Sequence, residues 1–151
     1  MDESLRELYQ EVILDHSRHP RHFGALADAT HRGEGYNPLC GDRVTVYLHL
    51  DGAGRIGDVS FEGRGCAISQ ASASLMTDLV KGRTVAEMEK LMGGFLHLVK
   101  GEGSDGLAAS DRETLEVMAG VSAFPMRVKC ATLAWHTMKS ALEGGQSART
   151  E

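Results

Sequence analysis

Apolar and polar residues alternate strictly from Arg43 to Leu50, and this alternation constrains the fold more than any other feature of the sequence. A period of two is typical of a β-strand with one buried face. The turn-forming segment Asp51-Gly52-Ala53-Gly54 follows, and residues 55–62 then place Val59 and Phe61 on one face of a second strand. The pattern predicts a β-hairpin.

Most of the remaining chain shows helical periodicity, in several places behind a capping box of Ser or Thr followed three residues later by Glu. The expected helices run from Ser4 to before Pro20, from about Ile68 to near Gly82, from Thr84 to about Met92, from Ser110 to near Gly120, and from Pro125 to about Leu142. One short strand is expected within residues 25–39. We therefore expect an α+β fold, with a small antiparallel sheet of about three strands and helices packed on one face.

The length of 151 residues fits one domain, which we place at residues 1–143, followed by a flexible C-terminal tail at 144–151. The net charge of −5 argues against nucleic acid or an anionic membrane surface as a partner. No apolar run is long enough to span a bilayer, and the acidic start of the chain does not resemble a signal peptide. We expect a cytoplasmic protein, in which three cysteines point to metal or sulfur chemistry rather than disulfides.

The predicted hairpin brings two of the cysteines together. If the turn is centred between Gly52 and Ala53, Cys40 faces Gly65, the neighbour of Cys66, and Asp42 lies at the same end. Cross-strand neighbours are about 5 Å apart, so a register shift of one or two residues would preserve this cluster. Glycines at 41, 63 and 65 would permit close backbone approach there.

Cys130 lies in the opening turns of the last expected helix, and the sequence alone does not fold that helix onto the hairpin. The position also fits ordinary core packing, since it belongs to an apolar helical stripe. The start of a helix beside Cys66, and Arg127 and Lys129 beside Cys130, would favour thiolates. Three thiolates with the Asp42 carboxylate would form a closed tetrahedral zinc site, although thiolates also hold iron–sulfur clusters.

Three motifs around these residues resemble those of the IscU/SufU family, the NifU N-terminal-like proteins of iron–sulfur cluster assembly. The motifs are Asn37-Pro38-Leu39-Cys40-Gly41-Asp42, Gly63-Arg64-Gly65-Cys66-Ala67-Ile68-Ser69, and Arg127-Val128-Lys129-Cys130-Ala131-Thr132-Leu133-Ala134-Trp135. The resemblance covers roughly residues 5–143. Lys129 stands where the IscU branch usually has histidine, and residues of about 101–124 resemble an insertion of the SufU branch, so both features indicate a SufU-type protein.

The resemblance implies a zinc site formed by Cys40, Asp42, Cys66 and Cys130. It also implies a pyridoxal-phosphate-dependent cysteine desulfurase of the SufS type as partner, one of whose histidines displaces Cys40 from zinc. Cys40 then accepts persulfide sulfur as the catalytic residue of a zinc-dependent sulfurtransferase, and a downstream iron–sulfur scaffold receives it. Arg127 is a candidate auxiliary residue that stabilises thiolates or orients Asp42.

Two other functions use the same residues. A cluster assembly scaffold would hold an iron–sulfur cluster in place of zinc, and a structural zinc domain would act only as an adaptor. Separately, His16, His19 and His22 suggest a metal cluster by spacing, but Pro20 interrupts the helix there, and we expect a solvated loop or a partner-contact surface.

Overall fold

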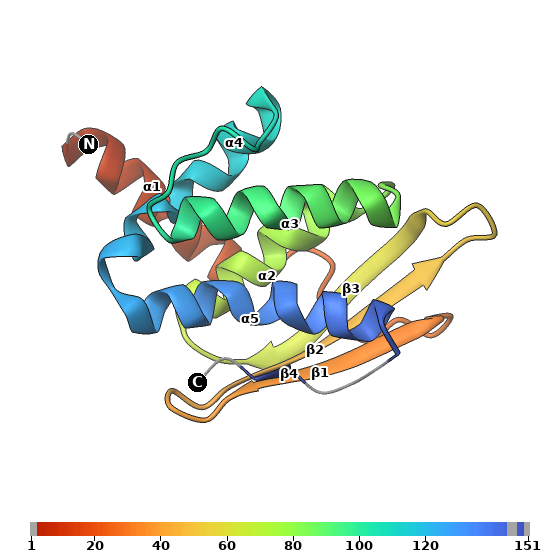
Figure 1. The fold of residues 1–151 in the computed structure, drawn as a ribbon. Helices are drawn as coiled ribbons and strands as arrows, with labels where there is room; N and C mark the ends of the chain where they lie inside the picture. Colours follow the sequence, from red (N-terminus) through yellow and green to blue (C-terminus); the bar gives the residue numbers. More distant parts are fainter. Residues whose placement is uncertain (1–2, 145–147, 150–151) are drawn as a thin grey trace.

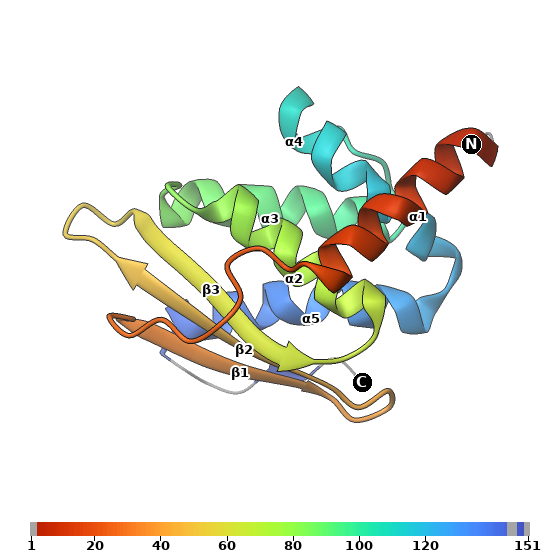
Figure 2. The same cartoon turned by 180° about the vertical axis from the view of Figure 1, so that it is seen from behind.

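The computed structural model describes residues 3–144 and 148–149, which form a sheet covered by helices on one face (Figure 1). In chain order the elements are α1 (Glu3–Arg18), β1 (His31–Asn37), β2 (Asp42–Leu50), β3 (Ile56–Arg64), α2 (Ala67–Val80), α3 (Val85–Val99), α4 (Ala109–Leu115), the 3-10 helix η1 (Glu116–Ala123), α5 (Pro125–Leu142) and β4 (Ala148–Arg149). The view from behind shows the other face of the sheet without a helix on it (Figure 2). The expected α+β architecture is confirmed.

The predicted hairpin is present as β2 and β3, with its register displaced by two residues. Val44 pairs with Gly63 and Arg43 with Arg64. The strand expected within residues 25–39 is β1, which pairs antiparallel with β2. The sheet order is β3-β2-β1-β4, and the short β4 runs parallel to β1. Of the tail predicted at 144–151, the structure describes only residue 144 and β4, and the rest lies outside the described residues.

Helix α5 lies across the inner face of the sheet and packs closely against β1. A Cβ on Gly33 would lie 2.8 Å from the backbone oxygen of Thr137, so only glycine admits α5 at this depth. Trp135 is fully buried on α5, and its ring stacks on Phe95 of α3 at a centroid distance of 4.5 Å. Burial of so much aromatic surface contributes strongly to the stability of the core.

Three helix boundaries differ from the sequence-based expectation. Helix α3 has the predicted Thr84–Glu87 capping box but continues to Val99, because Phe95 and Leu98 extend its buried stripe past the expected end. The capping box expected at Ser110 is wrong, since α4 begins at Ala109 without a side-chain cap.

Helix α1 also begins earlier than its predicted cap, at Glu3. No helix in the described part of the chain combines the length and apolar character needed to cross a membrane.

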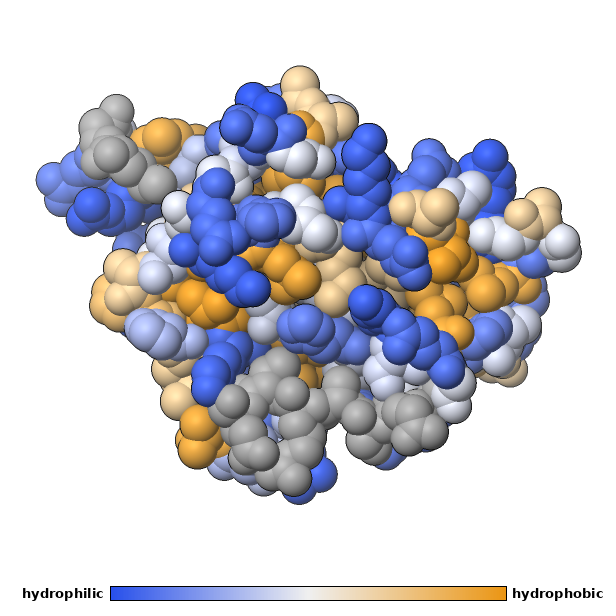
Figure 3. Space-filling model, in the orientation of Figure 1, coloured by the Kyte–Doolittle hydropathy of each residue, from blue (hydrophilic) through white to orange (hydrophobic). Residues whose placement is uncertain are grey.

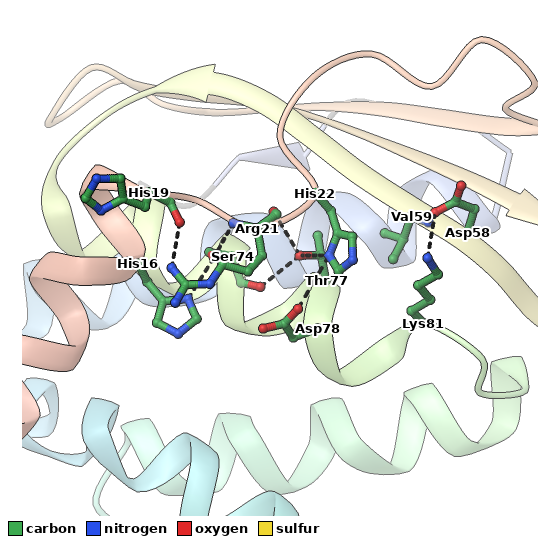
Figure 4. Close-up of polar contacts among 10 residues, drawn as sticks. All are labelled: His16, His19, Arg21, His22, Asp58, Val59, Ser74, Thr77, Asp78 and Lys81. Carbon is green, nitrogen blue, oxygen red and sulfur yellow. Dashed lines mark hydrogen bonds and ion pairs between the residues drawn. The ribbon is translucent and has the colours of Figure 1, made fainter.

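The segment that follows α1 is attached to α2 by buried hydroxyl groups (Figure 4). Ser74 Oγ accepts the backbone N–H of Arg21 at 2.8 Å and lies 2.7 Å from His16 Nδ1. Thr77 Oγ1 lies 3.2 Å from His22 Nδ1. The histidines were expected to lie in a solvated loop or a partner-contact surface, and this is wrong for His16, which is buried against α2 near the end of α1.

Candidate metal-binding site

The three cysteines and Asp42 meet at one end of the molecule, where the β1–β2 turn, the end of β3 and the start of α5 converge (Figure 1). Cys40 is exposed in the β1–β2 turn, and its Sγ lies 3.4 Å from Sγ of Cys130 on α5. One ligand atom each from Cys40, Asp42 and Cys130 lies within 4.8 Å of the other two. The folding of α5 onto the hairpin end, which the sequence left open, therefore brings Cys130 to the site.

Asp42 connects Cys66 to this group. Its Oδ1 accepts the backbone N–H of Cys66 at 2.9 Å, and its Oδ2 lies 3.6 Å from Cys66 Sγ. Asp42 is almost fully buried, whereas Cys66 is exposed. A buried carboxylate needs a hydrogen-bond donor or a cation beside it. The neighbouring cysteine thiols can act as donors, and a metal ion bound to them would be the cation.

Glycine at position 65 makes this arrangement possible. A Cβ on Gly65 would lie 2.5 Å from Oδ1 of Asp42, so any side chain there would displace the carboxylate. Gly63 has a φ of 145°, and a Cβ there would overlap the backbone of Arg43. The close approach expected at these glycines is confirmed.

Cys130 is positioned by a buried contact between α2 and α5 that the sequence analysis missed. Ser72 Oγ donates to the backbone oxygen of Ala131 at 2.5 Å and accepts Trp135 Nε1–H at 3.1 Å. In the sequence, the only indication of this role was that Ser72 is a polar residue on the otherwise apolar stripe of α2. The contact fixes the helical turn that carries Cys130.

Burial controls the ionisation of two of the thiols. Partial burial of the thiol raises the pKa of Cys66, although the residue as a whole is exposed. The effect is opposed by the N–H of Ser69, which donates to Cys66 Sγ at 3.4 Å and makes this sulfur the N-cap of α2. Burial and hydrogen bonds with Asp42 and Cys40 raise the pKa of Cys130. The effect expected from the helix start therefore acts at Cys66 through Ser69, but burial outweighs it, and the effect expected of Arg127 and Lys129 on Cys130 stays a prediction.

The donor set fits a tetrahedral metal. Two sulfurs bound to one zinc ion at about 2.3 Å are separated by roughly 3.8 Å, close to the 3.4 Å between Cys40 and Cys130. A divalent cation would also favour the thiolate forms of the two thiols whose pKa burial raises. The Arg127 guanidinium lies over the Phe124 ring at 4.3 Å, and its auxiliary role stays a prediction.

Comparison with known proteins gives consistent results. The sequence matches the family described as the NifU-like N terminal domain over residues 8–131. It is 39% identical to the iron–sulfur cluster assembly scaffold protein IscU of Streptococcus pyogenes serotype M1, covering 96% of this chain and 89% of that protein. It is also 39% identical to the zinc-dependent sulfurtransferase SufU of Bacillus subtilis strain 168, covering 94% of this chain and 96% of that protein.

The fold agrees with these similarities. A crystal structure of a Fervidobacterium islandicum AW-1 protein, assigned to the SUF system as an iron–sulfur cluster assembly scaffold, superposes with a TM-score of 0.78. It is 36% identical, and the match covers 91% of this chain and 98% of that one. The chain belongs to the IscU/SufU family and carries its NifU-like N-terminal domain.

Proposed function

We propose that this protein acts in iron–sulfur cluster assembly as a zinc-dependent sulfur acceptor, taking persulfide sulfur from a cysteine desulfurase. The family membership supports the assembly role, and the B. subtilis relative is a zinc-dependent sulfurtransferase. Cys40, Asp42, Cys66 and Cys130 would hold the zinc. When bound, zinc would keep the thiols deprotonated at neutral pH without redox chemistry of its own.

The observation that carries the proposal is the difference between Cys40 and the other two cysteines. Cys130 is buried, and Cys66 Sγ caps α2 by accepting the N–H of Ser69. Cys40 is exposed in a turn, and the described contact of its sulfur is with Cys130 alone. Cys40 is thus the sulfur that can leave the site for a partner with the least disturbance of the fold.

The transfer step follows from ordinary thiol–disulfide chemistry. The Cys40 thiolate attacks the outer sulfur of the donor persulfide, forming a new S–S bond as the S–S bond of the donor breaks. The electron pair leaves with the donor cysteine as its thiolate, and the transferred sulfur keeps its proton. No external oxidant or reductant is needed.

Two features of the chain favour this function over a cluster scaffold. Lys129 occupies the position before Cys130 where the resemblance associates histidine with the IscU branch. Residues 101–124, the proposed SufU insertion, form the α3–α4 loop, α4 and η1, and pack on the helical layer. The SufS type of the desulfurase, transfer to a downstream scaffold, and a cytoplasmic location belong to the same proposal.

The test is desulfurase turnover with and without the zinc-loaded protein, compared with Cys40→Ala. We expect stimulation by the wild type and its loss in Cys40→Ala, together with a persulfide on Cys40 detected by mass spectrometry after alkylation. Normal stimulation by Cys40→Ala would refute the assigned role. A stable [2Fe–2S] or [4Fe–4S] cluster formed on the protein from iron and sulfide, without stimulation, would establish the scaffold instead.

A further inference from the structure

Four basic residues lie near the site residues along the chain, two in the sheet and two in the helical layer. Arg43 and Arg64 lie on the helix-free face of the sheet, beside Asp42 and close to Cys66. Arg127 and Lys129 lie on the first turns of α5, beside Cys130. We call these four residues the cationic collar. The chain as a whole is acidic, with a net charge of −5, so the collar is a local departure from its overall charge.

The collar is not neutralised by the protein itself. Several basic side chains elsewhere in the described residues pair with carboxylates, as Arg21 does with Asp15 and Arg83 with Asp111, whereas others, such as Arg6 and Lys90, form no ion pair there. No ion pair within residues 3–144 involves a collar residue, and two of the four instead lie over aromatic rings. Arg43 lies over Tyr36, and Arg127 over Phe124, each at 4.3 Å.

Arg43 and Arg64 are also directly paired across the strands. Like charges at directly opposite positions destabilise a sheet. The isolated protein therefore carries a small energetic cost at this end, and an external anionic group placed between the two arginines would relieve it.

Large apolar side chains are exposed at the same end. Leu39, beside Cys40, is 60% exposed, and Phe124 and Met126, at the start of α5, are 49% and 42% exposed. We call these three the apolar patch. Figure 3 shows apolar surface where the β1–β2 turn and the start of α5 lie. An exposed apolar patch bordered by charge is typical of a protein–protein interface.

We infer that the cationic collar and the apolar patch form a docking surface for an acidic face of the sulfur-donating desulfurase. The inference rests on the proposed function and adds the chemistry of the partner surface. The patch supplies the desolvated centre of the interface, and the collar supplies complementary charge that accelerates encounter and orients Cys40 toward the persulfide. The apolar centre favours a protein over a nucleic acid, which would be bound through phosphates alone.

The test is the affinity of the desulfurase for variants made in a Cys40→Ala background, so that binding is measured without sulfur transfer. Arg43→Glu/Arg64→Glu reverses both charges of the sheet pair and keeps their mutual repulsion. The matched control is Arg6→Glu/Lys90→Glu, which makes the same change at exposed, unpaired positions on α1 and α3. Circular dichroism and thermal unfolding would be measured to check that both variants fold.

We expect the collar variant to bind about tenfold more weakly, mainly through slower association, and the control to remain within about twofold of the parent. Raising the salt from about 50 mM to about 300 mM should weaken the parent much more than the collar variant. If both variants weakened desulfurase binding equally, or if binding did not depend on salt, the proposed docking surface would be refuted.

Two outcomes separate this inference from the proposed function. If the parent binds the desulfurase and the collar variant binds equally well, only the docking surface is wrong. If the parent does not bind the desulfurase at all, the proposed function fails with it. Loss of binding to single-stranded RNA in the collar variant, with desulfurase affinity unchanged, would show that the collar serves a nucleic acid and would refute the protein partner.

Discussion

At the scale of single residues, Asp42 holds the site together. Its two carboxylate oxygens contact the backbone and the sulfur of Cys66, and one of them lies within 4.8 Å of the sulfurs of Cys40 and Cys130. Oxygen is a harder ligand than sulfur, so Asp42 would keep a zinc site more exchangeable than four thiolates would. Its geometry depends on the absence of a side chain at position 65.

Replacing Gly65 with alanine tests that dependence. The new Cβ would overlap Oδ1 of Asp42, and we expect zinc affinity to fall about tenfold or more, as for other changes that misorient a metal ligand. Competition with a chromogenic chelator measures the affinity. The control is Gly57→Ala in β3, where the nearest atom would lie 3.7 Å from the new Cβ. Equal zinc affinities for the two variants would contradict the role given to Gly65.

The residues of the site were largely predictable from the sequence, but their supports were not. Cys40 and Cys66 flank a hairpin whose alternation is unambiguous, so their proximity follows from local pairing. Ser72 gave no comparable signal, because its role depends on Ala131 and Trp135, which are distant in the chain and adjacent only after α5 has packed. The ionisation of Cys66 and Cys130 also depends on burial, which a sequence pattern does not quantify.

At the scale of elements, the contact between α2 and α5 determines where Cys130 lies. Ser72→Ala would leave Trp135 Nε1 without its acceptor in a buried position. We expect the free energy of unfolding to fall by about 2 kcal/mol, the usual cost of an unsatisfied buried donor. Urea denaturation measures this, with Ser110→Ala, at an exposed position on α4, as the control. Similar stabilities for the two variants would show that the hydroxyl is not needed.

Element boundaries were predicted well where local signals dominate and poorly where packing does. Thr84 caps α3 as expected, because the capping box is satisfied within one turn. The end of α3 was placed too early, since its last turns are held by burial of Phe95 and Leu98 rather than by any local stop signal. The hairpin register was displaced by two residues for two reasons: Leu50 pairs with Ile56, which centres the turn on Ala53, and an irregularity between His49 and Leu50 shifts the pairing once more.

At the scale of the whole molecule, stability is linked to pH through a buried histidine at the junction of α1 and α2 (Figure 4). Burial, with a contribution from the Arg21 charge, lowers the pKa of His16 below its ordinary value of 6.5, against the opposing influence of Asp78 and Asp15. The unfolded chain therefore binds this proton more readily than the folded protein. The resulting contribution to stability is present above pH 6.5 and is lost as the pH falls through the lowered pKa.

We therefore expect the free energy of unfolding to decrease on acidification below neutral pH, and to decrease less in His16→Gln. Urea denaturation of both proteins across this range measures the difference, because carboxylate and thiol titrations are common to the two. Parallel curves for wild type and variant would exclude His16 as the source. His136, whose pKa burial also lowers, would contribute in the same direction in both proteins.

The distribution of the site along the chain has a consequence for synthesis. Cys40 and Cys66 flank the hairpin, whereas Cys130 follows much later, on α5, the last helix among the residues that the structure describes. On a ribosome the first donors emerge long before the final one, so a nascent or truncated chain offers an incomplete site. The full set of donors comes together only after α5 has folded onto the sheet, so tight capture of a metal ion would follow that step of folding.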